Sequence, residues 1–364
     1  EATVTRRVTV QGERPYDVVV GRGIDAEIIA AVPDRANSVA VLHAPFAADQ
    51  AQRLAAEIDS SGRSALLIPL PDAEAAKTAA TTQMCWDALG AAQVTRTDAI
   101  VALGGGATTD QAGFVAATWL RGIDIIQVPT TVLAMVDAAV GGKTGINTSA
   151  GKNLVGSIHP PRAVICDLEQ ARTLRAADLA AGFAEIVKAG FIRDTSILDT
   201  IEADPTAALD PAGPVIDDLT VRAIAVKADV VADDLTESVD RVLGRETLNY
   251  GHTLARRIEK VEQYSWRHGD AVSVGMCFAA ALAQGTGELT ASDVQRHRTI
   301  LESLGLPTRY PHPERWPELL ATMRIDKKAR GATVRFIVLD GIGHPALLSG
   351  PSEDELHRAF QEVS

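Results

Sequence analysis

Two histidines stand sixteen residues apart in the segment GHTLARRIEKVEQYSWRHG, at positions 252 and 268. Catalytic divalent metals often take two histidines and one glutamate and keep one position open for substrate or water. Glu185, in GFAEIVKAG, is the best third ligand, because its apolar neighbours predict a buried helix face. Glu185, His252 and His268 therefore form a candidate metal site. Spacing alone leaves an alternative open, in which Glu185 only pairs with Lys188, one helical turn away, and the histidines are unrelated.

A glycine-rich segment, VALGGGATTDQAG at residues 101–113, follows a strand-like run and leads into a helix-like run. Glycine lets the backbone approach a phosphate closely, and a helix N-terminus attracts negative charge. The pattern indicates a diphosphate site. The spacing is not G-x-G-x-x-G, so a plain tight turn is the alternative.

A second polar segment, VPTTVLAMVDAAVGGKTGINTSAGKNLVG, covers residues 128–156. We expect no regular structure in it, and a stretch of that length in a compact domain is usually functional. Its two lysines on a glycine-rich backbone suit a phosphate or another anionic group. A long solvated loop is the alternative. The polar residues concerned are Thr130, Thr131, Asp137, Lys143, Asn147, Lys152 and Asn153.

The elements that must position these residues change character near residue 175. Before it, short β-branched runs alternate with Ala-rich helical patterns, which is typical of a parallel sheet covered on both faces that binds ligands at the carboxyl ends of its strands. After it, apolar residues recur at three- and four-residue steps with scarcely a strand. We predict an α/β domain over residues 1–175 and a mainly α-helical domain over residues 176–364. The expected strands lie at residues 38–45, 64–71, 98–106, 124–131 and 162–168.

Composition limits the class of protein. A formal net charge of −12 argues against nucleic-acid binding, although a few lysines in one cleft can still attract a small anion. The three cysteines lie far apart, which favours a reducing cytoplasm over a disulfide framework. The first residues lack the apolar core of a signal peptide, and charge or glycine interrupts the apolar runs well short of about 18 residues. We expect a cytoplasmic protein without a membrane segment.

Eight motifs in order, from about Tyr16 to Gly350, give the sequence a strong resemblance to the 3-dehydroquinate synthase family of sugar phosphate cyclases, in its actinobacterial form. They are PDAEAAK, GGGATTDQAGFVAATWLRG, VPTTVLAMVDAAVGGKTGIN, GKNLVGSIHPP, GFAEIVKAGFI, LNYGHT, WRHGDAV and MRIDKK. The resemblance implies a Rossmann-like N-terminal domain, a helical C-terminal domain, a cleft between them, and a homodimer.

The resemblance also implies an activity. The family converts 3-deoxy-D-arabino-heptulosonate 7-phosphate into 3-dehydroquinate and phosphate, using NAD and one divalent metal, zinc or cobalt. The C5 hydroxyl is oxidised transiently, phosphate leaves by β-elimination, the ketone is reduced again, and an intramolecular aldol reaction closes the ring. A dianionic phosphate and a carboxylate on the substrate require cations fixed in place, which the lysines and arginines of the motifs would supply.

Matching motif positions assign roles to individual residues. The implied metal ligands are Glu185, His252 and His268. The implied NAD contacts are Asp72, Glu74, Lys77, Gly105, Gly106, Asp110, Thr130, Thr131 and Thr173, with Lys143 and Lys152 near both cofactor and substrate. The implied substrate contacts are Asp137, Asn153, Lys188, Lys227, Arg245, Asn249 and one of Lys327 or Lys328. Arg121, in WLRG, matches the arginine that reaches the phosphate bound by a neighbouring subunit.

The sequence departs from the family at one position with chemical consequences. The family usually reads G-H-T-x-G/A-H-A-x-E, whereas this chain reads GHTLARRIE, so Arg256 replaces a second histidine and Arg257 an alanine. Arginine stays protonated and cannot act as a general base, but it can bind an anionic group bidentately. We expect Arg256 to face the site; the alternative is a side chain in solvent or paired with an acid. Gln111, Gly244 and His43 are milder departures.

Three other functions remain open. Another sugar phosphate cyclase, such as an aminodehydroquinate or valiolone-forming synthase, would share NAD and metal but differ at substrate-facing residues. A metal-dependent polyol dehydrogenase has a similar plan but no need for so many phosphate-binding cations. A weakly active or silent NAD- and metal-binding paralogue would follow if Arg256 abolished proton transfer.

Overall fold

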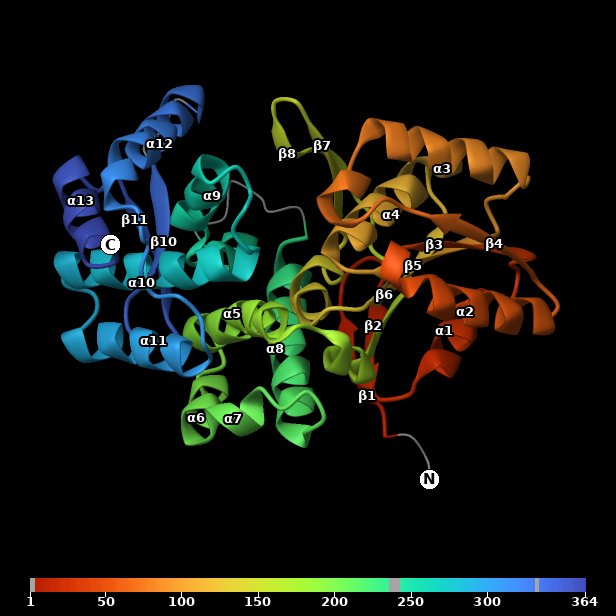
Figure 1. The fold of residues 1–364 in the computed structure, drawn as a ribbon, viewed down its shortest axis with the longest axis horizontal. Coiled ribbons are helices and arrows are strands. Elements are labelled where there is room, and N and C mark those ends of the chain that lie inside the picture. Colours follow the sequence, from red (N-terminus) through yellow and green to blue (C-terminus); the bar gives the residue numbers. More distant parts are fainter. Residues whose placement is uncertain (1–3, 236–242, 331–333) are drawn as a thin grey trace. The chain divides into compact units, whose positions relative to one another are not determined.

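The computed structural model describes residues 4–235, 243–330 and 334–364, without the side chains of residues 325–330. The chain folds into two compact units, Glu1–Leu174 with Lys227–Leu235 and Arg175–Val226 with Thr236–Ser364. Helix α8 (Pro214–Asp233) therefore begins in the second unit and ends in the first. The sequence does not predict this return. Figure 1 shows the elements of each unit.

The first unit is built on a seven-stranded sheet in the order β1-β2-β9-β6-β5-β3-β4. All neighbours are parallel except β1 and β2, which form an antiparallel pair at one edge. The five strands expected from the sequence are all present. The strands are β1 (Arg6–Val10), β2 (Tyr16–Gly21), β3 (Ser38–His43), β4 (Ser64–Pro69), β5 (Ala99–Gly104), β6 (Asp124–Pro129) and β9 (Ala163–Asp167).

Both faces of this sheet are buried, which explains why its strands are apolar without alternation. In β3, Val39 and Val41 point into one apolar cluster with α1 (Asp25–Ala31) and α2 (Ala48–Ser60). Ala40 and Leu42 point into the opposite cluster with α3 (Ala79–Ala91) and α4 (Gly106–Thr118). Successive side chains of a strand face opposite sides, so each helical layer receives every second residue. The predicted α/β fold class is confirmed.

The segment after β6 has regular structure, and the expectation of a long irregular loop at residues 128–156 was wrong. A π-helical turn, η4 (Ala134–Ala138), is followed by an antiparallel hairpin of β7 (Lys143–Thr148) and β8 (Gly151–Ile158). The many glycines of the segment hid the two-residue alternation of a strand. Short helical turns complete the unit: η1 (Pro45–Ala47), η2 (Ala73–Ala76), η3 (Trp119–Arg121) and η5 (Leu168–Thr173).

The second unit is mainly helical, as expected. It contains α5 (Ala176–Ile192), α6 (Ser196–Ala203), α7 (Pro205–Ala208), the start of α8, η6 (Arg245–Asn249), α9 (His252–Val261), α10 (His268–Thr286), α11 (Ala291–Ser303), η7 (Pro313–Arg315), α12 (Trp316–Arg330) and α13 (Glu353–Gln361). A two-stranded sheet of β10 (Arg335–Leu339) and β11 (Pro345–Ser349) is also present, which corrects the expectation of scarcely a strand. No helix among the described residues is both long and apolar enough to cross a membrane.

Helices α5 and α10 form the centre of the second unit. Every residue of α5 from Leu179 to Ile192 is buried, and α10 is nearly as enclosed. Their backbones approach closely at Gly269, where a Cβ atom would collide with the carbonyl group of Ala181. This close approach sets the polar residues of α5 beside the first turn of α10.

Candidate functional site

Three ligand atoms meet inside the second unit. Glu185 lies in the middle of α5, while His252 and His268 are the first residues of α9 and α10. Oε1 of Glu185 is 3.3 Å from Nε2 of His252 and 3.5 Å from Nε2 of His268, and one ligand atom from each residue lies within 4.8 Å of the others. The structure thus brings together the three residues predicted as metal ligands.

In both histidines Nδ1, the ring nitrogen that does not face Glu185, lies beside a hydrogen-bond acceptor. Nδ1 of His252 lies 3.2 Å from the carbonyl oxygen of Tyr250, and Nδ1 of His268 lies 3.2 Å from Oε1 of Glu259. A carbonyl oxygen can only accept, so Nδ1 of His252 donates and its Nε2 keeps a lone pair. Metal-binding histidines commonly show this arrangement. Oε1 of Glu185 is buried and has no hydrogen-bond partner within the part of the chain that the structure describes. The donor set fits a divalent cation.

Charge in this cluster is balanced at close range. Lys188, one turn along α5, forms an ion pair with Oε2 of Glu185, and both side chains are buried. Burial alone would raise the pKa of Glu185, but Lys188 and His252 hold it well below its ordinary value. Burial would lower the pKa of His268, yet the nearby carboxylates of Glu185 and Glu259 raise it to about 10. Burial, followed by Lys188, lowers the pKa of His252. The negative field at His268 therefore favours a cation.

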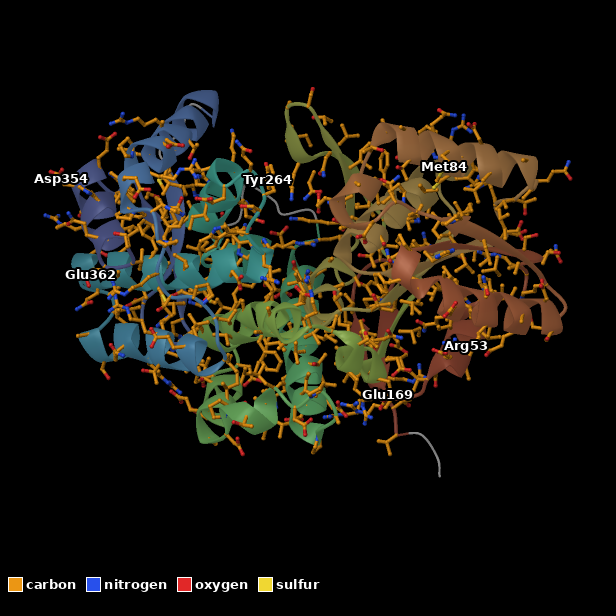
Figure 2. The ribbon with its side chains drawn as sticks, in the orientation of Figure 1. Arg53, Met84, Glu169, Tyr264, Asp354 and Glu362 are labelled. Carbon is orange, nitrogen blue, oxygen red and sulfur yellow. The ribbon has the colours of Figure 1, made fainter. Side chains whose placement is uncertain are left out.

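The connection between α9 and α10 brings His268 back towards α9. Gln263 and Tyr264 both have left-handed backbone conformations, with φ of 51° and 61°. Such conformations cost about 1–3 kcal/mol each for residues other than glycine. The amide of Tyr264, a residue labelled in Figure 2, donates to the carbonyl oxygen of Glu259 at 2.6 Å. At the other end of α9, Gly251 supplies the left-handed residue that precedes His252, with φ of 80°. The packing of this unit must offset the strain in the turn.

A second polar cluster lies in the first unit, where the hairpin β7–β8 meets η2. The buried ammonium group of Lys77 is 2.8 Å from Oδ2 of Asp110, and it also donates to Oδ1 of Asn153. Asn153 has φ of 56°, and its main-chain amide donates to Oδ1 of Asn147. These contacts join residues predicted to bind cofactor and substrate.

The same cluster has an exposed acidic side. Oε2 of Glu74 accepts a hydrogen bond from Nδ2 of Asn147 at 2.7 Å and lies 3.6 Å from Nζ of Lys152. Burial raises the pKa of Asp110 to about 6, although Lys77 acts in the opposite direction. Asn147, on β7, donates to Glu74 of η2 and accepts from the main-chain amide of Asn153 on β8. In the sequence it is only one polar residue of the segment 128–156, because these tertiary contacts follow no local pattern.

Two further predicted residues meet where α8 ends in the first unit. Nζ of Lys227 is 2.6 Å from Oδ1 of Asp137 and also donates to the carbonyl oxygen of Asp137. Asp137 lies in the π-helical turn, a structure that is frequent at functional sites. These residues are 90 positions apart, so only the fold could reveal the pair.

The glycine loop joins β5 to α4. Gly105 is the N-cap of α4 and Gly106 its first residue, so the backbone amides of the first helical turn are aimed at the loop. Thr130 and Thr131 follow β6, the strand that pairs with β5. The hydroxyl of Thr130 is buried and has no hydrogen-bond partner among residues 4–235, 243–330 and 334–364. An anionic dinucleotide group is the chemistry that such a loop accepts.

The other predicted site residues differ in their exposure and lie on different elements. Asp72 is the exposed N-cap of η2, and the hydroxyl of exposed Thr173 donates to the carbonyl oxygen of Gln170. Lys143 is exposed at the start of β7, whereas Arg245 is buried in η6, which also carries Asn249. Arg121 is exposed at the end of η3, with φ of 65°. The side chains of Lys327 and Lys328, on α12, lie outside the described residues.

Arg256 is exposed on α9, and its Nη2 donates to Oδ1 of Asn249 at 2.8 Å. It therefore contacts a residue predicted to hold the substrate. Its neighbour Arg257 donates to the carbonyl oxygen of Thr253 on its own helix. Gln111 is fully buried and donates to the hydroxyl of Thr82 at 2.8 Å. This contact satisfies the amide nitrogen of Gln111, whereas its buried Oε1 has no hydrogen-bond partner among the described residues.

Solved structures identify the class that combines this fold with this site. The chain is similar to 2-epi-5-epi-valiolone synthase from Streptomyces hygroscopicus subsp. jinggangensis, solved with NAD⁺ and Zn²⁺ bound, at 25% identity and a TM-score of 0.86, covering 98% of this chain and 99% of that one. It is also similar to 2-deoxy-scyllo-inosose synthase, solved with carbaglucose-6-phosphate, NAD⁺ and Co²⁺, at 26% identity and a TM-score of 0.86, covering 99% and 100%. The fold is that of the sugar phosphate cyclases.

Sequence comparison identifies the family within that class. The model for the 3-dehydroquinate synthase N-terminal region matches residues 67–181, and that for the C-terminal region matches residues 182–329. A curated 3-dehydroquinate synthase of Streptomyces avermitilis is 55% identical over 352 residues, which cover 97% of this chain and 96% of the relative. The chain belongs to the 3-dehydroquinate synthase family, and the resemblance inferred from its motifs is confirmed.

Proposed function

We propose that the protein converts 3-deoxy-D-arabino-heptulosonate 7-phosphate into 3-dehydroquinate and phosphate, as an NAD- and divalent-metal-dependent lyase of the shikimate pathway. Membership of the family supports this activity. The observation that carries it is the buried Oε1 of Glu185, which faces Nε2 of His252 and of His268. A buried carboxylate oxygen without a hydrogen-bond donor is costly unless a cation compensates it.

Bound NAD⁺ would supply a reversible hydride acceptor, and a bound divalent metal, zinc or cobalt, would supply a Lewis acid. Glu185, His252 and His268 would hold the metal. The residues proposed to hold the dinucleotide are Asp72, Glu74, Lys77, Gly105, Gly106, Asp110, Thr130, Thr131 and Thr173, with Lys143 and Lys152 beside it. The hydrogen bonds of Lys77 to Asp110 and Asn153 would keep the hairpin ordered next to the cofactor.

Cationic, amide and carboxylate side chains would bind the substrate. The residues proposed are Asp137, Asn153, Lys188, Lys227, Arg245, Asn249 and one of Lys327 or Lys328. The positive charges of the lysines and of Arg245 suit a phosphate and a carboxylate. Arg256 stays protonated and cannot remove the C6 proton. The substrate phosphate, whose second pKa is about 6, can accept that proton as it departs.

The assignment within the sugar phosphate cyclases follows from similarity. The chain is 55% identical to a curated 3-dehydroquinate synthase, against 25% and 26% for the valiolone and inosose synthases. The alternatives of a different cyclase and of a polyol dehydrogenase are therefore not favoured.

The assembly and location are also proposals. We propose a homodimer in which Arg121 of one subunit reaches the phosphate bound by the other, and a cytoplasmic protein that binds neither nucleic acid nor membrane. The net charge of −12 supports the absence of nucleic-acid binding. We further propose that residues 1–175 form the NAD-binding domain and residues 176–364 the metal- and substrate-binding domain.

A phosphate-release assay tests the proposed activity. Purified protein with NAD and zinc is given the heptulosonate phosphate, with and without a chelator. We expect chelator-sensitive phosphate release without accumulation of NADH, because the hydride returns to the product. Accumulation of NADH with a polyol would instead identify a dehydrogenase. Bound NAD without any turnover would identify a silent paralogue.

A further inference from the structure

Glu259 contacts one of the proposed metal ligands without being a ligand itself. It lies on α9, seven residues after His252, and two turns of a helix return a side chain to almost the same face. Its Oε1 is 3.2 Å from Nδ1 of His268, the first residue of the next helix. Helix α9 therefore provides one imidazole and also a contact to the other.

The two histidines differ in the acceptor that lies beside Nδ1. His252 donates to a neutral main-chain carbonyl group, that of Tyr250, which is only two residues away in sequence. His268 faces an anionic carboxylate from another helix, and it is less enclosed than His252. Its ring orientation therefore depends on a tertiary contact rather than on local backbone.

We propose that Glu259 is a positioning residue, which fixes the ring of His268 with Nε2 towards Glu185 and adds one negative charge next to the cation. This inference rests on the metal site of the proposed function. The geometry of the α9–α10 turn supports it, since the main-chain hydrogen bond from Tyr264 to Glu259 closes the turn that returns the chain to His268. A carboxylate that accepts a hydrogen bond from the second ring nitrogen of a metal-binding histidine fixes the ring and makes the ligand more basic.

Zinc affinity of the metal-free protein, measured by competition with a chromophoric chelator, tests the proposal without any assay of activity. Glu259→Ala removes both the acceptor and the charge, and we expect zinc to bind about 10–100-fold more weakly. Glu259→Gln keeps an acceptor oxygen and removes only the charge, so its loss should be smaller. With Co²⁺ in place of zinc, the visible absorption of the Glu259→Ala variant should shift, because the ligand ring is no longer fixed.

Glu314 offers a matched control in the same unit. Its Oε1 lies 3.2 Å from Nδ1 of His312, the same contact outside the metal cluster, and both side chains are exposed. Glu314→Ala should leave zinc affinity and the cobalt spectrum unchanged.

The outcomes separate this inference from the proposed function. Zinc affinity of folded Glu259→Ala within twofold of the unsubstituted protein overturns the positioning role. If Glu259→Ala does not fold, Glu259→Gln decides, and it must bind zinc more weakly than Glu314→Gln. His252→Ala reports on the metal site itself. If that variant binds zinc as well as the unsubstituted protein does, the metal site of the proposed function fails, and this inference fails with it.

Discussion

Replacing Lys188 by methionine tests the charge balance of the buried cluster. Lys188 and Glu185 are 4% and 3% exposed and form an ion pair one turn apart on α5. Removing one partner of a buried pair leaves an uncompensated charge and costs about 3–5 kcal/mol. Two imidazoles beside Glu185 can carry a proton in compensation, so we expect the lower end, about 3 kcal/mol. In a domain of 150–250 residues that loss lowers Tm by about 6–12 °C.

Calorimetry of the metal-free protein in chelator measures this loss, and a second scan with excess zinc tests its origin. Zinc at about 1,000 times its Kd stabilises a protein by about 4 kcal/mol. The gain should be larger in Lys188→Met than in the unsubstituted protein, because the ammonium group no longer competes with the metal for Glu185. Lys260→Met, on the exposed side of α9, is the matched control and should change stability by about 0.5 kcal/mol or less.

Two results would refute this reasoning about Lys188. The first is a Tm of Lys188→Met in chelator within about 2 °C of the unsubstituted protein, since a domain of this size would then have lost only about 1 kcal/mol or less. The second is an equal gain from zinc in both proteins, since Lys188 would then not compete with the cation.

Three other perturbations have defined outcomes. Gly269→Ala should destabilise the protein by about 1–3 kcal/mol and weaken zinc binding, because the new Cβ collides with the carbonyl group of Ala181. Thermal melts measure the loss of stability. The control is Gly285→Ala on the same helix, where a Cβ meets nothing within 4 Å, and it should be neutral or stabilising. Arg256→His should raise kcat about tenfold or more in the phosphate-release assay, because it restores an acid–base group. An unchanged or lower kcat would show that Arg256 does not limit turnover. Burial raises the pKa of Asp110 from 3.8 to about 6, so the folded state binds more protons between these values and its stability rises as pH falls through about 6. Urea unfolding at pH 7.5 and 5.5 should show this gain relative to Asp110→Asn, and a gain in the opposite direction would contradict the assignment.

The α/β half could be predicted from sequence because its information is local. Strands such as β3 and β5 are short, continuous apolar runs, and a sheet covered on both faces requires that composition. The long helices of the second unit likewise follow from apolar residues at three- and four-residue steps. The hairpin β7–β8 was missed because glycines interrupt its alternation, and β10 was missed because its apolar run RFIVL lies within a helical half.

The sequence by itself determined the set of chemical groups in this protein: one glutamate, two histidines, a glycine loop and a group of cations, in an order that identifies the family. It did not determine which of them touch. Lys77 reaches Asn153 across 76 residues, and Glu259 meets His268 only because two left-handed residues return the chain between α9 and α10. Hydrogen bonds and ion pairs act over a few ångströms in space, and separation along the chain does not encode that distance. Packing of the folded units therefore decided which residues hold each ligand group in place.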